Sequence, residues 1–331
     1  MKKAVLLLMI LLTVLACKNK DKPSKTLASA TGRFNELLVI TTEQDWAGET
    51  GTKLKQILTA DVLGLPQPEP QFSIIRIDPN QFTGLLERTR NVLRIKYADT
   101  TSFNVTKNKY AAPQVIITLK AKDTESMVNL IQEHANDLVN IYKKSDLADL
   151  RRRPPSKPYN IDRINFFKSQ NLSLRVPDMF EIVDDQKDFV WFRDETYDPG
   201  KDINGSKNII VYTLPLTTDF KNLKDSIANI RDQIGKKHLP GPREDTYMIT
   251  EAAYTPHVFD AEFKGHSSYK TLGKWEIYNS YMAGPFVSYT VDDSAHNRLI
   301  VAEGFVYAPL VFKRDFMFEL EAIIGTLTIN D

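Results

Sequence analysis

The longest apolar run of the chain lies at its beginning, where Ala4 to Leu15 is dominated by aliphatic side chains. At about 1.5 Å per helical residue this run spans roughly 18 Å, well short of the ~30 Å hydrocarbon core of a bilayer. Lys2 and Lys3 precede it and form a short positive region. The pattern therefore predicts a secretory signal over residues 1–16 rather than a permanent transmembrane helix.

The first half of the remaining chain alternates between strand and helix patterns. Leu54, Ile57 and Leu58 recur at helical spacing, whereas Asn91 to Tyr97 alternates apolar and polar residues as a half-exposed strand does. Prolines at every second position make residues 64–70 an extended connector. The predicted strands are 37–40, 72–77, 91–97 and 114–119, the predicted helices are 46–58, 80–88 and 123–142, and residues 100–111 are expected to form a polar loop.

The second half is richer in strands and aromatic residues. Predicted strands are 172–176, 189–192, 209–214, 247–250, 258–263, 274–278, 286–291 and 298–306, and predicted helices are 219–234 and 315–327. Consecutive strands with short connections are typical of an antiparallel sheet covered on one face. The sequence thus predicts the α+β class, with two domains that are each a mainly antiparallel sheet packed with a few helices.

The stretch from Arg151 to Pro158 carries three arginines and three prolines and interrupts these patterns. We therefore expect an N-terminal domain over residues 32–152, a linker over 153–160 and a C-terminal domain over 161–331. The arginines allow two interpretations. They could contact phosphate headgroups or an acidic partner, or they could complement the dipole of a solvated helix end, which is the interpretation we favour.

The segment Val14-Leu15-Ala16-Cys17 ends the signal and resembles the bacterial lipobox, in which the cysteine is lipidated and becomes the first mature residue. Cys17 is the only cysteine in the chain, so lipidation would leave neither a free thiol nor a disulfide. Residues 17–31 are then a lipidated cysteine and a flexible tether of roughly 20 Å reach. Lys18 favours sorting to the outer membrane. An ordinary signal peptide with an incidental Cys17 is the alternative.

Composition excludes some functions and leaves others open. Without residues 1–16 the chain has 41 basic and 42 acidic residues, which gives no electrostatic case for nucleic acid. Neither a nucleophile elbow nor a phosphate-binding glycine loop occurs, so we expect no cofactor. The histidines are scattered, and a zinc site made from His257 and His266 is a remote alternative.

Two carboxylate groupings are candidate sites. Asp198, Asp202 and Asn204 have the spacing of a weak calcium loop, but Tyr212 stands where such a loop needs its bidentate glutamate, so a solvated loop is the simpler interpretation. A glycosidase pair could come from the carboxylates of a second segment, although the sequence gives no distance between them. That set is Asp184, Asp185, Asp188 and Glu195.

Several motifs together resemble an uncharacterised lipoprotein family of Bacteroidota, known only as a domain of unknown function. They are Asp45-Trp46-x-Gly48, the connector 64–70, Val176-Pro177 through Phe189-Val190-Trp191-Phe192-Arg193, and Glu303 to Pro309. The resemblance covers nearly the whole mature chain and transfers no site residue. It implies an outer-membrane lipoprotein. In that group an acidic run after the cysteine favours surface display, and the single Asp21 here favours the periplasmic side.

The sequence therefore predicts a membrane-anchored envelope lipoprotein that binds a protein or glycan partner, without a catalytic residue or a metal. The alternative is an envelope hydrolase that acts on glycan or cell-wall material. Cys17 is the one residue whose chemistry, lipidation, the sequence assigns.

Overall fold

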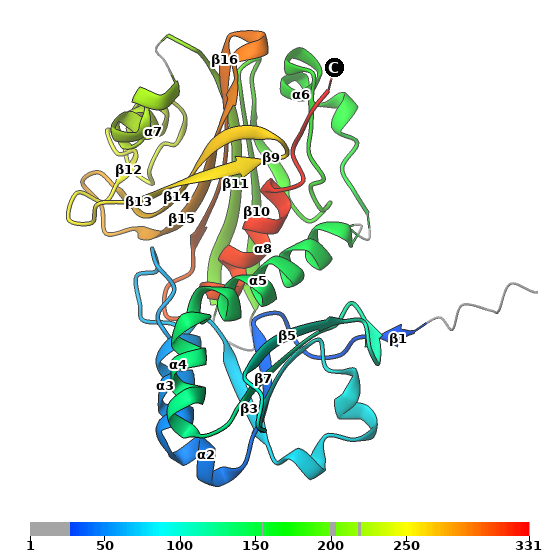
Figure 1. Cartoon of the computed structure of the whole chain (residues 1–331). Coiled ribbons are helices and arrows are strands. Elements are labelled where there is room, and N and C mark those ends of the chain that lie inside the picture. The colour runs from blue at the N-terminus through cyan, green and yellow to red at the C-terminus, as the bar shows by residue number, and fades with distance from the viewer. Residues whose placement is uncertain (1–26, 154, 156, 199–202, 218–219, 331) are drawn as a thin grey trace, which may run out of the picture.

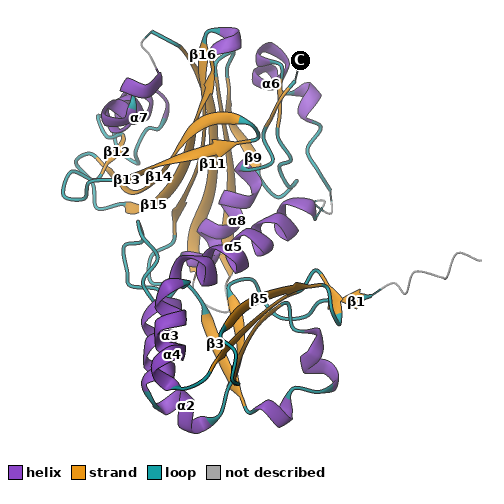
Figure 2. Ribbon diagram, in the orientation of Figure 1, coloured by secondary structure: helices purple, strands orange, loops and turns teal. Residues whose placement is uncertain are grey.

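Two separate sheets organise the residues that the computed structural model describes, which are 27–153, 155, 157–198, 203–217 and 220–330. Figure 1 shows the N-terminal sheet below and the C-terminal sheet above, with helices α5 (Ala135–Arg152) and α8 (Arg314–Ile324) between them. Figure 2 shows the same arrangement by element type, with α2, α3 and α4 beside the N-terminal sheet and α7 beside the C-terminal sheet. The α+β class with two domains is confirmed.

The N-terminal sheet has five strands in the order β3-β2-β4-β7-β5. The strands are β2 (Glu36–Ile40), β3 (Ser73–Ile77), β4 (Asn91–Tyr97), β5 (Ser102–Lys107) and β7 (Val115–Ala121). The first four strands of that order pair in parallel, and only β5 is antiparallel, on β7. The sheet is therefore mainly parallel, and the expectation of a mainly antiparallel sheet does not hold for this domain.

The physical reason for the parallel pairing lies in both connections and burial. Helices α2 (Glu43–Ala47) and α3 (Glu49–Leu58) return the chain between β2 and β3, as a parallel crossover requires. Residues 37–40 are all buried, alternate ones in two different clusters, so both faces of β2 are covered. A continuous apolar run is the signature of such a strand.

Helix α4 (Thr124–Glu133) and α5 form the outer layer of this domain with α3. The predicted single helix 123–142 is divided at His134, which ends α4 and precedes α5, and its ring stacks on Phe103 at 4.3 Å. Helix α5 then runs to Arg152, ten residues past the predicted end. The predicted helix 80–88 is two short 3₁₀ turns.

The C-terminal sheet is antiparallel, with the order β12-β14-β15-β16-β11-β10-β9 and β13 paired to β14. Its strands are β9 (Glu181–Asp185), β10 (Phe189–Asp198), β11 (Ile203–Pro215), β12 (Met248–Thr250), β13 (His257–Phe263), β14 (His266–Ile277), β15 (Ala283–Asp293) and β16 (Arg298–Tyr307). Helices α6 (Asn165–Gln170) and α7 (Ile227–His238) complete the domain, together with the short pair β8 (Leu172–Ser173) and β17 (Thr328–Ile329).

Both faces of this sheet are covered, whereas the sequence suggested one. Val190 and Phe192 pack in the cluster that includes α8, and Phe189 and Trp191 pack in the cluster that includes Ile234 of α7. One face therefore carries α8 and the opposite face carries α7. Phe189, Trp191 and Phe192 of β10 are core, as aromatic residues in a strand usually are.

The beginning of the described chain forms β1 (Ala28–Ser29), which pairs in parallel with β6 (Ala111–Ala112). The last residues of the predicted tether are thus part of the fold. The predicted signal peptide and Cys17 lie outside the described residues. Within the described ranges, no helix is long and apolar enough to cross a membrane.

Candidate functional site

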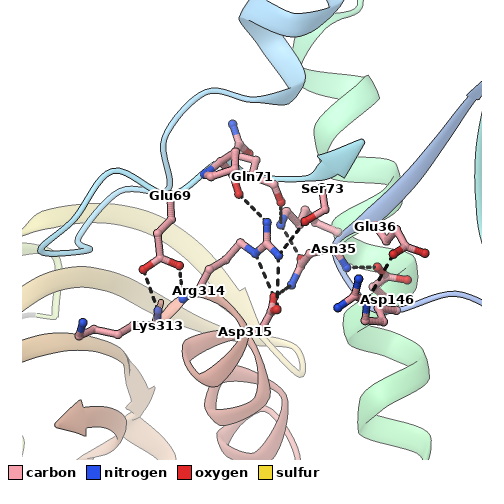
Figure 3. A network of polar contacts seen from close by, with 12 residues as sticks. Asn35, Glu36, Glu69, Gln71, Ser73, Asp146, Lys313, Arg314 and Asp315 are labelled. Carbon is pink, nitrogen blue, oxygen red and sulfur yellow. Dashed lines mark hydrogen bonds and ion pairs between the residues drawn. The ribbon is translucent and has the colours of Figure 1, made fainter. Parts of the chain in front are cut away.

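A buried glutamate joins the two domains. Glu69, in the proline-rich connector, accepts hydrogen bonds from the backbone N–H groups of Lys313 and Arg314 at 2.7 and 2.8 Å (Figure 3). These are free donors at the beginning of α8, so the carboxylate satisfies them and complements the positive end of the helix dipole. Arg314 returns the contact by donating to the carbonyl oxygen of Pro70. The connector thereby fixes the position of α8.

A second set of polar contacts fixes α5 at the same seam, by which we mean the region where the two domains meet. Asp146 of α5 accepts from the backbone N–H of Asn35 at 3.0 Å, and the Asn35 side chain donates to Asp315 of α8 at 3.0 Å (Figure 3). Arg90 donates to Asp146 and Asp149 on consecutive turns of α5. These contacts hold the beginning of α8 and the C-terminal half of α5 against the N-terminal domain.

Three adjoining cavities surround the C-terminal end of α5, and we call them together the basic groove. The largest, of about 650 Å³, shares Arg151, Arg175 and Thr326 with a smaller one of about 170 Å³. That one shares Leu150, Arg153 and Glu319 with a third of about 530 Å³. Ala30 and Arg33 line the third cavity, so the groove begins where the described chain begins.

The largest cavity of the groove gathers four cations from separate parts of the chain. Arg151 and Arg152 come from the last turn of α5, Arg175 follows β8, and Lys264 stands in the turn between β13 and β14. None of the four forms a salt bridge with a described carboxylate, and Glu262 is the only acidic residue of the lining. By contrast, Arg153 pairs with Asp149 at 2.8 Å.

Helix dipoles do not balance this charge. Arg175 donates to the carbonyl oxygen of Arg151 at the end of α5, and Lys264 donates to that of Thr326 just past α8, at 3.0 Å. Each helix end supplies only about half a negative charge. Two helix ends and Glu262 therefore offset only part of the four positive charges. The lining of this cavity carries more positive than negative charge.

Arg151 is the most constrained of these cations. Its Nε is buried without a hydrogen-bond partner, and its guanidinium lies so close to Gly325 that a Cβ there would be 2.3 Å from Nε. Its charge also helps to lower the pKa of Glu321: burial raises that pKa, but Lys270, Tyr289 and Arg151 outweigh it. The charge of Arg151 is thus partly compensated, while its Nε–H stays without an acceptor.

Mutual repulsion marks the site as electropositive. The pKa of Lys264 is lowered, first by burial and then by the charges of Arg151 and Arg175. A guanidinium presents several N–H donors in a fixed plane that matches phosphate or carboxylate oxygens. Ser173 and Thr328 add hydroxyl groups, and Tyr159 and Phe263 add apolar wall. The groove therefore presents cationic and hydroxyl donors beside an apolar wall.

The carboxylates proposed for a hydrolase are engaged in structural contacts. Asp185 accepts from the backbone N–H groups of Asn165 and Phe166 at the start of α6, at 2.8 and 2.9 Å. Asp184 accepts from Gln186, and Glu195 is exposed 3.9 Å from Arg193. None of the cavities described here is lined by them or by Asp188.

The metal candidates are not assembled either. Asp202 lies outside the described residues. The backbones of Asp198 and Asn204 belong to β10 and β11, but their side chains lie outside the described part of the structure. His257 and His266 stand at opposite ends of β13 and the turn that follows it. Among the described residues, no group of three or more histidine, cysteine, aspartate or glutamate side chains could hold a metal ion.

The sequence offered a basic contact at Arg151 and its neighbours only as the less favoured of two interpretations, and it gave no role to Arg175 or Lys264. Arg175 occupies a strand pattern and Lys264 a turn, where single cations are common. Lys264 has a positive φ of 51°, which marks the tight turn that presents it. No local signal in the sequence connects these two positions to α5.

The fold defines a two-domain α+β protein with a cavity of about 650 Å³ at the C-terminal end of α5. The chain belongs to the family described as "Domain of unknown function (DUF4837)", whose model matches residues 160–326. A second model, "Domain of unknown function (DUF8532)", matches residues 30–154. No curated protein matches the chain in sequence.

Solved structures with partial likeness have low similarity. A mutant of protein Mog1 and the Saccharomyces cerevisiae Ran-binding protein Mog1p each cover 48% of this chain and 91% and 90% of their own, with 8% identity and a TM-score of 0.32. LpqN, described as involved in cell envelope biogenesis of Mycobacterium tuberculosis, covers 48% of this chain and 83% of its own, with 14% identity and a TM-score of 0.30.

Proposed function

We propose that this chain is a lipid-anchored, non-enzymatic protein of the outer membrane that binds a phosphate-bearing envelope molecule in its basic groove. The observation that carries the proposal is the convergence of Arg151, Arg152, Arg175 and Lys264 on one cavity without matching carboxylates. A phosphate monoester supplies up to about two negative charges and three acceptor oxygens, which suits the excess charge and the exposed donors.

The position of the groove supports this function. Its third cavity is lined by Ala30 and Arg33, directly after β1, and Arg153 of α5 lies over the ring of Phe34 at 4.8 Å. In Figure 1, β1 and the C-terminal end of α5 lie on the same side of the molecule. A chain lipidated at Cys17 would hold this side within roughly 20 Å of the membrane surface. The groove would then meet headgroups at the periplasmic side.

The anchor is tested by changing Cys17→Ser in the full chain and following the protein by cell fractionation. Because the stable attachment of a lipoprotein comes from its acyl chains, we expect the variant to move from the membrane to the soluble fraction. Lys18→Ser, which leaves the cysteine, is the matched control and stays membrane-bound. Equal membrane association of the Cys17→Ser protein and the wild type would contradict the anchor.

The ligand class is tested with the mature Cys17→Ser protein, which has no lipid of its own. We expect it to sediment with vesicles that contain phosphatidic acid, whose headgroup is a phosphate monoester, and to stay in solution with phosphatidylcholine vesicles, because only the first present net negative phosphate. Binding should weaken as salt is raised.

A soluble phosphate source has a different signature. Saturable binding of glycerol phosphate in calorimetry, without sedimentation on either vesicle, would assign the groove to a free phosphorylated molecule. Absence of both kinds of binding at low ionic strength would refute the proposed function.

A further inference from the structure

A second cavity, on the opposite face of the C-terminal sheet, is built from aromatic rings. It measures about 250 Å³ and lies beneath the loop that follows α7. Trp191 of β10, Trp275 of β14, and Phe305 and Tyr307 of β16 form its walls. Neighbouring ring centroids are 5.8 to 6.5 Å apart, so the four rings make one continuous surface.

The polar groups of this cavity are held in fixed positions. Asn208 is 1% exposed, and its Oδ1 accepts from Trp191 Nε1 at 3.0 Å and from Arg193 Nε at 3.2 Å. Strand pairing sets this geometry, because Asn208 stands opposite Arg193 on one side and Phe305 on the other. The guanidinium of Arg193 lies over the Trp191 ring, 4.6 Å from its centre. The amide thus orients both an aromatic face and a cation.

One buried donor of this cavity has no partner. Trp275 is 2% exposed, yet its indole Nε1–H finds no acceptor among the described residues. The ring lies across Gly284 on the neighbouring strand, where a Cβ would be 2.9 Å from Nε1. A buried N–H without an acceptor destabilises the folded chain, and most such groups in proteins are paired, so this donor suggests a ligand acceptor.

We infer that this cavity binds the ring of a sugar that carries an acyl or carboxylate oxygen. The flat C–H face of a sugar ring packs on indole and phenol faces, and the site offers donors rather than acceptors for the oxygen. Trp275 Nε1–H has no acceptor among the described residues, and the oxygen of Asn208 is already occupied. Arg193 adds a positive charge, which the exposed carboxylate of Glu195, 3.9 Å away, screens only in part. The inference does not depend on the basic groove, because the two sites lie on opposite faces of the sheet.

The test uses tryptophan fluorescence, since two of the three tryptophans line this cavity. Trp46→Phe removes the third, which lies in the N-terminal domain. In this background we expect saturable quenching by N-acetylglucosamine or by glucuronic acid. Glucose should bind at least about tenfold more weakly, because it has only hydroxyl and ring oxygens and lacks the acyl or carboxylate oxygen. Whichever of the first two binds identifies the acyl or the carboxylate form.

Two variants connect the signal to the site. Arg193→Gln and Trp275→Phe, which keeps an aromatic ring, should each weaken binding by about tenfold. Arg163→Gln, an exposed arginine outside this cavity, should leave it unchanged. The inference is overturned if none of the three sugars quenches saturably, if glucose binds as well as the others, or if both site variants bind like the parent. Far-ultraviolet circular dichroism confirms that each variant is folded.

Discussion

Replacing Arg231 with methionine is expected to lower the free energy of unfolding by about 3–5 kcal/mol. The Arg231 guanidinium donates to both carboxylate oxygens of Glu303 at 2.8 to 3.1 Å, and the two residues are 5% and 1% exposed. Methionine fills a similar volume but leaves the carboxylate buried without its cation. Chemical denaturation followed by circular dichroism measures the loss.

The same variant should show a characteristic pH dependence. Burial raises the pKa of Glu303 above its ordinary value of 4.5, and Arg231 opposes that rise. Without Arg231 the pKa rises further, so the folded variant holds a proton that the unfolded chain has released. Its stability therefore falls as pH increases from the ordinary carboxyl range toward the raised pKa. The deficit relative to wild type should be smaller near pH 5 than near pH 8.

Two controls separate the buried charge from lost packing. Adding Glu303→Gln to the Arg231→Met protein removes the charge, and we expect it to recover part of the stability and to abolish the extra pH dependence. Arg163→Met removes an exposed arginine and should change stability by less than about 0.5 kcal/mol. A loss of the same size in Arg163→Met and Arg231→Met would show that the buried pair has no special role.

The double change Arg151→Gln and Arg175→Gln is expected to weaken the binding of glycerol phosphate about 100-fold. Each guanidinium would donate to a charged oxygen, a contact that contributes about 1.5 kcal/mol or more, and about 1.4 kcal/mol corresponds to a tenfold change in affinity. Glutamine keeps a polar side chain of similar length. Isothermal titration calorimetry at low salt measures the affinities.

The matched control for this double variant is Arg163→Gln with Lys168→Gln. It also removes two positive charges, and both residues are exposed and outside the lining of the groove cavities. We expect its affinity to stay within about threefold of wild type, because only long-range attraction changes. If the two double variants lost affinity equally, net charge rather than the groove would explain the binding.

Local periodicity was sufficient to locate most elements of the fold. Leu54 and Leu58 face the core from α3, as their spacing predicted. In the C-terminal sheet β12, β13 and β16 begin and end within one residue of the expected bounds, whereas β10, β11 and β14 extend six to eight residues further at one end, and β9 was not predicted. The edge strand β5 was missed because its side chains are largely exposed and leave no apolar alternation. The parallel direction of the N-terminal strands was missed because direction depends on crossover connections.

The candidate site was only partly visible in the sequence. The favoured interpretation placed Arg151 and Arg152 at a helix end, and the structure does put them in the last turn of α5. The sequence did not predict that Arg175 and Lys264 line the same cavity as these arginines, since their positions depend on how α5 and α8 pack where the two domains meet. Glu69, which fixes α8 there, lies in a connector that the sequence presented only as an extended spacer.

The second cavity shows the same limit. Trp191 lies in a strand, where aromatic residues are more often core than ligand-binding, and it is 6% exposed within the aromatic cluster. The alternation of a strand predicts which face a side chain occupies. It does not predict that Trp275 and Tyr307, from strands distant in sequence, leave a space beside that ring.

A structure with a phosphate ligand tests the central claim most directly. Crystals of the mature Cys17→Ser protein, grown without phosphate or sulfate, would be soaked in glycerol phosphate. We expect the phosphate group to bind in the largest cavity of the groove, within hydrogen-bond distance of Arg151 and Arg175 and close to Lys264. A ligand bound only elsewhere, or an empty groove at a ligand concentration that saturates binding in calorimetry, would contradict it.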